Sequence, residues 1–151
     1  MRKYMELAIK EAKKAFAKAE VPIGAVLVKN DEVIATAHNL KEINNDPTAH
    51  AEILVIQEGA QRLHTWRLED CDLYVTVEPC AMCAGAIVQS RIRRLIIGAM
   101  EPKFGAAGSI VNIVNHPKFN HRVEVFEGIM EEECSQLMKD FFLLLREKRN
   151  K

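Results

Sequence analysis

Two cysteines three positions apart are the residues in this sequence whose spacing most clearly indicates chemistry. Cys80 follows Pro79 directly, and Cys83 lies three positions further on. Thiols three apart on a helix share one face, so both sulfurs can reach one ion. Pro79 suits a first helical turn, and the positive end of the helix dipole favours thiolates, the form that binds zinc. Taken alone, the pattern also fits a redox dithiol of the thioredoxin-like kind.

A third ligand is suggested by His50, which is followed two positions later by Glu52. Residues two apart do not face each other inside a helix, so both can serve one site only from its first turn. The segment 46–48 has the composition of a helix start. We therefore expect two helix N-termini, near residues 48 and 80, to face each other across one ion.

The charges of this group favour a catalytic zinc site. A neutral His50 and the thiolates of Cys80 and Cys83 together balance a zinc dication, and three protein ligands leave a fourth position for water. Zinc lowers the pKa of such a water toward neutrality, and Glu52 is placed to move its proton to a substrate nitrogen. A binding module with structural zinc would need a fourth protein ligand, and no further Cys or His has suitable spacing. The redox interpretation also weakens once His50 and Glu52 are counted.

Helices and strands must alternate to position these residues. The segment 99–121 is too irregular for one element. Hydrophobic periodicity and turn residues predict the following order: helix 2–19, strand 23–28, strand 33–37, helix 48–63, strand 73–77, a helix from 78–79 to 90, strand 94–98, strand 123–126 and helix 130–147.

This order predicts an α/β fold. Asn30 and Asp31 form the turn of a hairpin between the first two strands, and the strand-helix-strand-helix-strand order predicts that the later strands are parallel. Helices should cover both faces, which gives a three-layer α/β/α sandwich around a mixed five-stranded sheet. The length of 151 residues fits a single domain spanning 1–151.

Composition excludes some classes of protein. The 21 basic and 21 acidic side chains cancel, so any surface that binds nucleic acid must be local. Residues 1–16 alternate charged and apolar residues, which is not a signal peptide, and no run approaches the roughly 18 apolar residues of a membrane span. We expect a cytoplasmic protein with reduced cysteines, in which Cys71 and Cys134 are buried as small apolar residues.

The motifs His50-x-Glu52 and Pro79-Cys80-x-x-Cys83 resemble those of the cytidine-deaminase-like zinc deaminases, in which they supply the zinc ligands and a proton shuttle. The chain further resembles the bacterial tRNA-specific adenosine deaminases over nearly its whole length, in the blocks 20–28, 45–56, 73–92, 105–109, 119–125 and 140–149.

This resemblance implies a cytidine-deaminase-like fold with one Zn²⁺ per subunit, a homodimer, and a tRNA anticodon stem-loop as partner. The implied reaction is hydrolytic deamination of adenosine to inosine at the wobble position. A deaminase of a free base or nucleoside, such as guanine or cytosine, would share every zinc residue and stays open as the alternative.

The resemblance also implies a base pocket. An asparagine after the second strand, here Asn39, reaches into it, although a turn residue is the plainer interpretation. Ile23 and Val28 are candidates for its apolar wall, although strand residues are more often core. The helix within 81–100 is apolar on more than one face, so it is either deeply buried or part of an interface, and a homodimer would fit.

Contacts to the RNA are implied in two further regions. Glu101 and Lys103 follow the fourth strand, where the family more often has Asp at the position of Glu101. Phe142 and Arg146 lie in the last helix. Phe141 and Phe142 are adjacent, so they point in different directions: one belongs to the core and the other can stack on a base, and the sequence does not decide which.

Overall fold

The structure is a computed structural model that describes residues 1–150, and within them four helices and five strands follow the expected order. Their bounds are α1 Arg2–Ala17, β1 Gly24–Lys29, β2 Glu32–His38, α2 Ala51–Leu63, β3 Cys71–Val77, α3 Ala81–Gln89, β4 Arg94–Ala99, β5 Glu124–Phe126 and α4 Glu131–Arg149.

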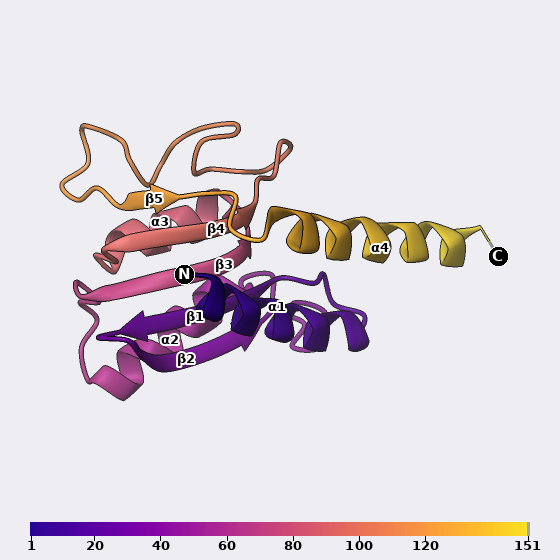
Figure 1. Cartoon of the computed structure of the whole chain (residues 1–151), viewed down its shortest axis with the longest axis horizontal. Coiled ribbons are helices and arrows are strands. Elements are labelled where there is room, and N and C mark those ends of the chain that lie inside the picture. Colours follow the sequence, from indigo (N-terminus) through magenta and orange to yellow (C-terminus); the bar gives the residue numbers. More distant parts are fainter. Residues whose placement is uncertain (151) are drawn as a thin grey trace.

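The strands form one mixed sheet in the order β2-β1-β3-β4-β5. β1 is antiparallel to both β2 and β3, whereas β3, β4 and β5 are parallel. Because β3 and β4 run the same way, the segments that follow them leave the sheet at one edge (Figure 1). Cys80 and Cys83 follow β3, so this edge carries the candidate site.

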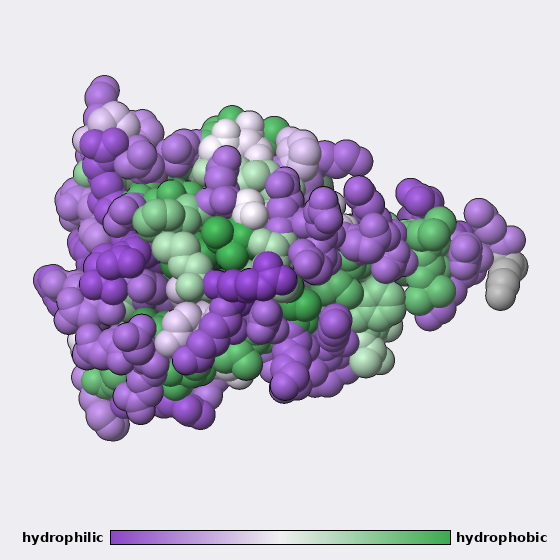
Figure 2. Space-filling view, in the orientation of Figure 1, coloured by the Kyte–Doolittle hydropathy of each residue, from purple (hydrophilic) through white to green (hydrophobic). Residues whose placement is uncertain are grey.

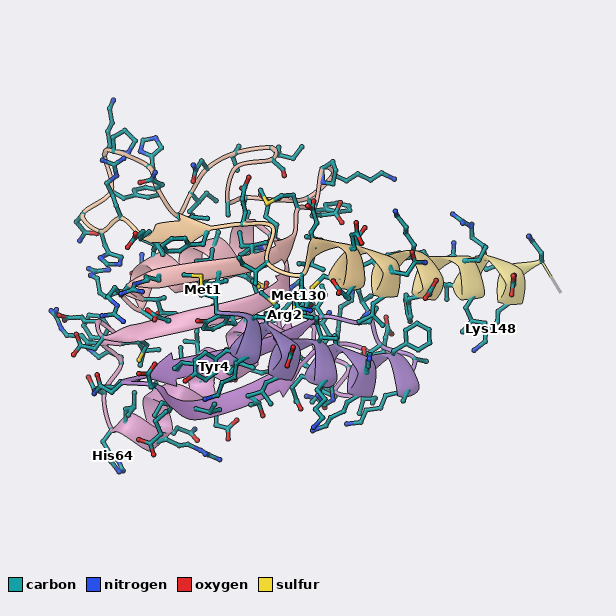
Figure 3. All side chains as sticks on the ribbon, viewed as in Figure 1. Met1, Arg2, Tyr4, His64, Met130 and Lys148 are labelled. Carbon is teal, nitrogen blue, oxygen red and sulfur yellow. The ribbon has the colours of Figure 1, made fainter. Side chains whose placement is uncertain are left out.

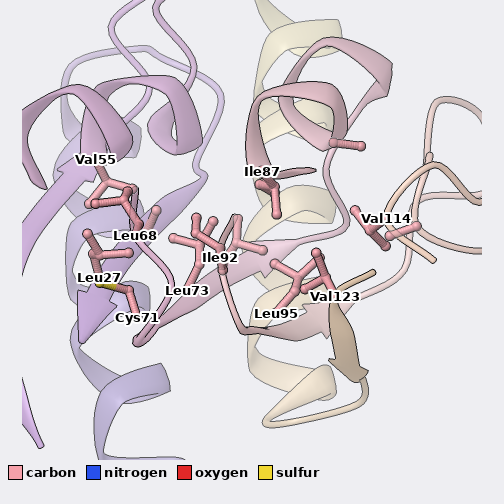
Figure 4. Packing of buried hydrophobic residues seen from close by; sticks show 14 of the residues in the cluster. Leu27, Val55, Leu68, Cys71, Leu73, Ile87, Ile92, Leu95, Val114 and Val123 are labelled. Atoms are coloured by element: carbon pink, nitrogen blue, oxygen red, sulfur yellow. The ribbon is translucent and has the colours of Figure 1, made fainter. Parts of the chain in front are cut away.

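Helices cover both faces of the sheet, as the sequence predicts (Figure 1). On one face, Val55 of α2 and Ile87 of α3 belong to the same buried cluster as Leu27, Leu73 and Leu95 of the strands (Figure 4). On the other face a second cluster joins α1 and α4 to the sheet through Met5, Ile9, Val26, Ile96 and Cys134. The three-layer α/β/α sandwich is confirmed, and Cys71 and Cys134 are buried in its core as expected.

α1 lies close to β1 because Gly24 has no side chain. A Cβ at this position would lie 1.9 Å from the backbone oxygen of Ala8 and 2.6 Å from the backbone nitrogen of Ala12. Only glycine allows a helix backbone to approach a strand so closely. The contact fixes α1 on the face of the sheet opposite α2 and α3.

α2 begins later than the sequence indicated. The helix expected from residue 48 starts at Ala51, with His50 as its N-cap. The side-chain oxygen Oδ1 of Asp46 instead accepts hydrogen bonds from the backbone N–H of Thr48, at 2.8 Å, and from its hydroxyl, at 2.7 Å. Asp46 therefore stabilises a turn rather than the helix start, because short acidic side chains bond local backbone groups equally well in turns.

α4 packs against β4 at its beginning and then projects beyond the sheet, as Figure 1 shows. Lys148 lies on this projecting part (Figure 3). Apolar and polar side chains both lie along it in the space-filling view (Figure 2). Among residues 1–150, no helix combines the length and the apolar character that crossing a membrane requires.

Candidate active site

His50 and Cys80 hold equivalent positions at the starts of two neighbouring helices. Each is the N-cap of its helix, with an extended backbone (φ −78°, ψ 150° for His50; φ −74°, ψ 177° for Cys80), and neither side chain caps its helix by a hydrogen bond. We expected Pro79 in the first turn of α3, but it precedes the N-cap residue of that helix. Both side chains are free to meet beyond the two helix mouths.

The ligand atoms of His50, Cys80 and Cys83 all lie within 4.8 Å of one another. Nδ1 of His50 is 3.7 Å from Sγ of Cys80 and 3.5 Å from Sγ of Cys83. A tetrahedral zinc ion with ordinary Zn–N and Zn–S bonds separates such atoms by about 3.6 Å. The structure therefore brings together the three residues that the sequence suggested, at distances that fit one zinc ion.

Without a cation, the pKa values of the two thiols move in opposite directions. Hydrogen bonding with Cys83 lowers the pKa of Cys80 to about 5, against the opposing effect of burial. The same hydrogen bond, together with burial, raises the pKa of Cys83. A dication placed between the sulfurs would stabilise both thiolates, so metal binding here releases protons.

Glu52 lies one residue inside α2 and is buried, with 3% of its surface exposed. Its Oε1 atom is buried and has no hydrogen-bond partner among residues 1–150. Burial raises the pKa of Glu52 to about 7. A carboxyl group that gains and loses a proton near neutrality, with an unpaired oxygen beside three metal-ligand atoms, is suited to general acid–base work.

Asn39 has a role that the sequence did not indicate. Its Oδ1 accepts a buried hydrogen bond of 2.8 Å from the backbone N–H of Ala51, the first residue of α2. One half of the amide therefore fixes the helix that carries His50 and Glu52. Ile23 is directly beside it, because the backbone N–H of Asn39 donates to the carbonyl oxygen of Ile23 at 3.2 Å. Asn39 thus contacts the residue that follows His50, and Ile23 lies next to Asn39.

Val28 does not border the site, and its expected place in the pocket wall is wrong. It pairs with Asp72 at the start of β3, whereas the ligands follow the end of that strand. Its side chain is buried in the cluster that faces α1, on the other side of the sheet from α2 and α3. Val28 is a core residue.

Glu78 is a buried residue that the sequence analysis missed. Only 4% of it is exposed, and its carboxylate accepts hydrogen bonds from four donors of the segment 101–109. Three are backbone N–H groups at 2.9 Å and the fourth is a hydroxyl: Glu101 N, Ala107 N, Ser109 N and Ser109 Oγ. Although burial raises the pKa of Glu78, these hydrogen bonds outweigh it and hold the pKa below its ordinary value of 4.5.

Glu101 and Lys103 lie in the segment that Glu78 holds. The Oε1 atom of Glu101 accepts a 3.0 Å hydrogen bond from the backbone N–H of Lys103, which closes a tight turn. Lys103 is exposed, and Glu101 is half-buried. The structure thus attaches both residues to the strand end that leads to Cys80.

Phe141 and Phe142 separate into core and surface. Phe141 is buried and meets the ring of Phe16 edge-on, with 5.8 Å between the ring centres. Phe142 has 41% of its surface exposed. Phe142 and Arg146 lie on the projecting part of α4, on the α1 side of the sheet, so the structure does not bring them into the ligand group.

Comparisons with known proteins identify the family of this chain. Residues 1–146 match the MafB19-like deaminase family. Over 97% of this chain and 91% of the relative, the sequence is 55% identical to a tRNA-specific adenosine deaminase of Bacillus subtilis. It is 50% identical to one of Aquifex aeolicus, over 95% of this chain and 94% of that protein.

A solved structure gives the same result for the fold. It comes from studies of A-to-I editing by tRNA:A34 deaminases at the wobble position of transfer RNA. It superposes with a TM-score of 0.88 at 47% identity, over 91% of this chain and 99% of that one. The chain therefore belongs to the MafB19-like deaminase family and, within it, to the bacterial tRNA-specific adenosine deaminases.

Proposed function

We propose that residues 1–151 form one zinc-dependent deaminase domain that converts adenosine to inosine at the wobble position of a tRNA anticodon. The observation that carries the proposal is that three metal-ligand atoms and one unpaired carboxylate oxygen lie close together at the N-termini of α2 and α3. Such a group fits hydrolysis, and the relatives named tRNA-specific adenosine deaminase support adenosine in tRNA as its substrate.

His50, Cys80 and Cys83 would hold a single zinc ion, with the charge of the two thiolates balancing that of the metal. When bound, zinc supplies a water molecule acidified toward neutral pH. All three ligands come from helix starts, where the positive ends of the dipoles favour thiolates and backbone N–H groups can stabilise developing negative charge.

Glu52 performs the proton transfers. Its carboxylate takes one proton from the attacking water and gives a proton to ring nitrogen 1 of adenine, as the water oxygen bonds to carbon 6. A second transfer through Glu52 moves the proton of the new hydroxyl on carbon 6 to the amino group. The bond from carbon 6 to this nitrogen breaks, the carbonyl of inosine forms, and ammonia leaves. Adenosine and water thus become inosine and ammonia. A pKa of about 7 lets Glu52 accept and release protons at neutral pH.

Asn39 and Ile23 are placed to receive the base. Oδ1 of Asn39 is engaged with Ala51, so its Nδ2 group is the part that can donate to the purine or the ribose. Ile23 offers half-buried apolar surface next to it. The adenine must be splayed out of the anticodon loop to enter, as single-stranded loops allow.

RNA contacts outside the pocket would come from Glu101, Lys103, Phe142 and Arg146. The exposed ring of Phe142 can stack on a base, and the cations can bind phosphates. The overall charge of zero requires that this basic surface be local. α4 projects beyond the edge of the sheet at which β3 and β4 end, so these side chains can reach an anticodon stem-loop there (Figure 1).

We further propose a homodimer in the cytoplasm. The outward face of α3 carries small or apolar residues, with Met82 38% exposed and open space next to Gly85. An uncharged surface of this kind is typical of an interface with a second copy. Sedimentation equilibrium would detect the dimer, and a strictly monomeric chain at micromolar concentration would contradict it.

The function can be tested by ammonia release from the zinc-loaded protein. An anticodon stem-loop with a wobble adenosine is compared with free adenosine, guanine, cytosine and cytidine. We expect turnover of the stem-loop alone. Turnover of a free base alone would keep the zinc chemistry and contradict the RNA substrate.

A further inference from the structure

The buried carboxylate of Glu78 receives its hydrogen bonds from the loop 101–109. Backbone N–H groups of Glu101, Ala107 and Ser109, and the hydroxyl of Ser109, donate to its two oxygens. Among residues 1–150 it forms no ion pair with Lys, Arg or His. Loop donors therefore stabilise the charge, and hydrogen bonds to an ionised acceptor are about twice as strong as neutral ones.

The backbone of the same short segment reinforces the attachment. The carbonyl oxygen of Pro79 accepts a 2.8 Å hydrogen bond from the backbone N–H of Ala106, and the N–H of Glu78 donates to the carbonyl oxygen of Ala99 at 2.8 Å. Only Pro79 separates Glu78 from Cys80, and the proline ring fixes its own φ. The loop and the N-cap cysteine of α3 are thus fastened to one stiff segment.

Gly105 shows how closely the loop approaches this carboxylate. A Cβ on Gly105 would lie 2.2 Å from both Cδ and Oε1 of Glu78. The packing leaves no room for a water molecule between them, so the loop conformation depends directly on the position of the carboxylate.

We propose that Glu78 is a positioning residue for deamination: it fixes Glu101 and Lys103 relative to Cys80, so that the substrate loop and the metal site keep one geometry. This inference rests on the proposed function for the role of the loop. Without the carboxylate, the exposed residues 102–104 of this loop become mobile and bind RNA less well, although Ala106 and Ala107 stay buried. The three ligand atoms keep their places on α2 and α3.

The first test is limited trypsin digestion of Glu78→Gln at the exposed Lys103–Phe104 bond, with zinc content measured in parallel. Glutamine keeps the size but replaces one acceptor oxygen by a donor, which leaves at least one loop N–H unpaired. We expect cleavage at this bond to be roughly ten-fold faster, with about one zinc per chain retained. Ser109→Ala, which removes one donor and keeps the charge, should give a smaller increase.

Asp72→Asn is the matched control, because Asp72 is a carboxylate at the opposite end of β3 that pairs with Arg93. It should leave cleavage after Lys103 within about two-fold of the parent chain. Unchanged cleavage in Glu78→Gln, an equal increase in Asp72→Asn, or loss of zinc from Glu78→Gln would each overturn the proposal.

The kinetic test separates positioning from chemistry. For an anticodon stem-loop, Glu78→Gln should raise KM about ten-fold and change kcat by less than about three-fold, because the proton-transfer group is untouched. Glu78→Asp, which keeps the charge, should recover part of the loss. A drop confined to kcat would overturn the positioning role. If the parent chain does not deaminate the stem-loop, the proposed function fails, while the digestion result still decides whether Glu78 holds the loop.

Discussion

Gly105→Ala adds only one methyl group, but it should lower the free energy of unfolding by a large amount. The backbone of Gly105 does not lie in the left-handed region, so the alanine is not strained by its own conformation. The new Cβ would lie 2.2 Å from Cδ and Oε1 of Glu78, where contact normally begins at 3.4 Å. The carboxylate must therefore retreat by about 1 Å, or the loop must lift by the same amount.

The hydrogen bonds to Glu78 now measure 2.9 Å. Such a shift lengthens them to distances at which a hydrogen bond is no longer formed. Losing two hydrogen bonds to a charged acceptor, at about 1.5–3 kcal/mol each, predicts a loss of at least about 3 kcal/mol in the free energy of unfolding. For a domain of this size this lowers Tm by about 10 °C.

Urea denaturation at fixed protein and zinc concentration measures the effect, with Gly105→Ala also placed in a Glu78→Ala background. With the carboxylate absent, the added methyl group should cost less than about 0.5 kcal/mol, so the two substitutions couple strongly. A cost below about 1 kcal/mol in the parent chain, or additivity of the two changes, would refute the steric argument.

Three further predictions concern the ligands, the helix start and pH. Cys83→Ala should reduce bound zinc from about one to below about 0.2 per chain by elemental analysis, because two ligands hold zinc poorly; full retention would contradict its assignment. Asn39→Ala should cost about 1–2 kcal/mol in urea denaturation, since the buried N–H of Ala51 loses its acceptor; an unchanged midpoint would show that this bond is dispensable. Burial raises the pKa of Glu11, but hydrogen bonds from Lys14 and His38 outweigh it and hold the pKa below 4.5 in the folded chain. The stabilisation is therefore present above about pH 4.5 and is lost as the pH falls through the lower folded-state pKa; Glu11→Gln should flatten this part of the stability–pH curve, and an unaltered slope would contradict it.

The fold was accessible from sequence because each element has its own pattern. The apolar stripe of α1, with Met5, Ala8, Ile9 and Ala12, has helical spacing and is buried against the sheet. The helix between β3 and β4 then dictates their parallel pairing. The start of α2 was misjudged because Asp46 and Thr48 bond each other locally, and turns and helix caps use the same residue types.

The metal ligands could be predicted from the sequence because metal binding restricts both the residue types and their spacing. Val28 was misplaced because β1 is buried along nearly its whole length and has no polar alternation from which to read which face each residue occupies. Glu78 was missed because its partners are loop donors more than twenty residues away, most of them backbone N–H groups that no pattern of side chains reveals. Because Phe141 and Phe142 are neighbours in a helix, the sequence shows that their side chains point in different directions. Only the contact with Phe16 assigns Phe141 to the core.

Glu52 is proposed to move the protons of a zinc-dependent deamination at a wobble adenosine. The most direct measurement compares parent chain and Glu52→Gln, each with its zinc content determined, by mass spectrometry of the nucleosides released from a treated anticodon stem-loop. We expect inosine at the wobble position with the parent chain. Glu52→Gln should keep the same zinc content but form roughly a thousand-fold less inosine. Equal inosine from both proteins, or none from the zinc-loaded parent chain, would contradict it.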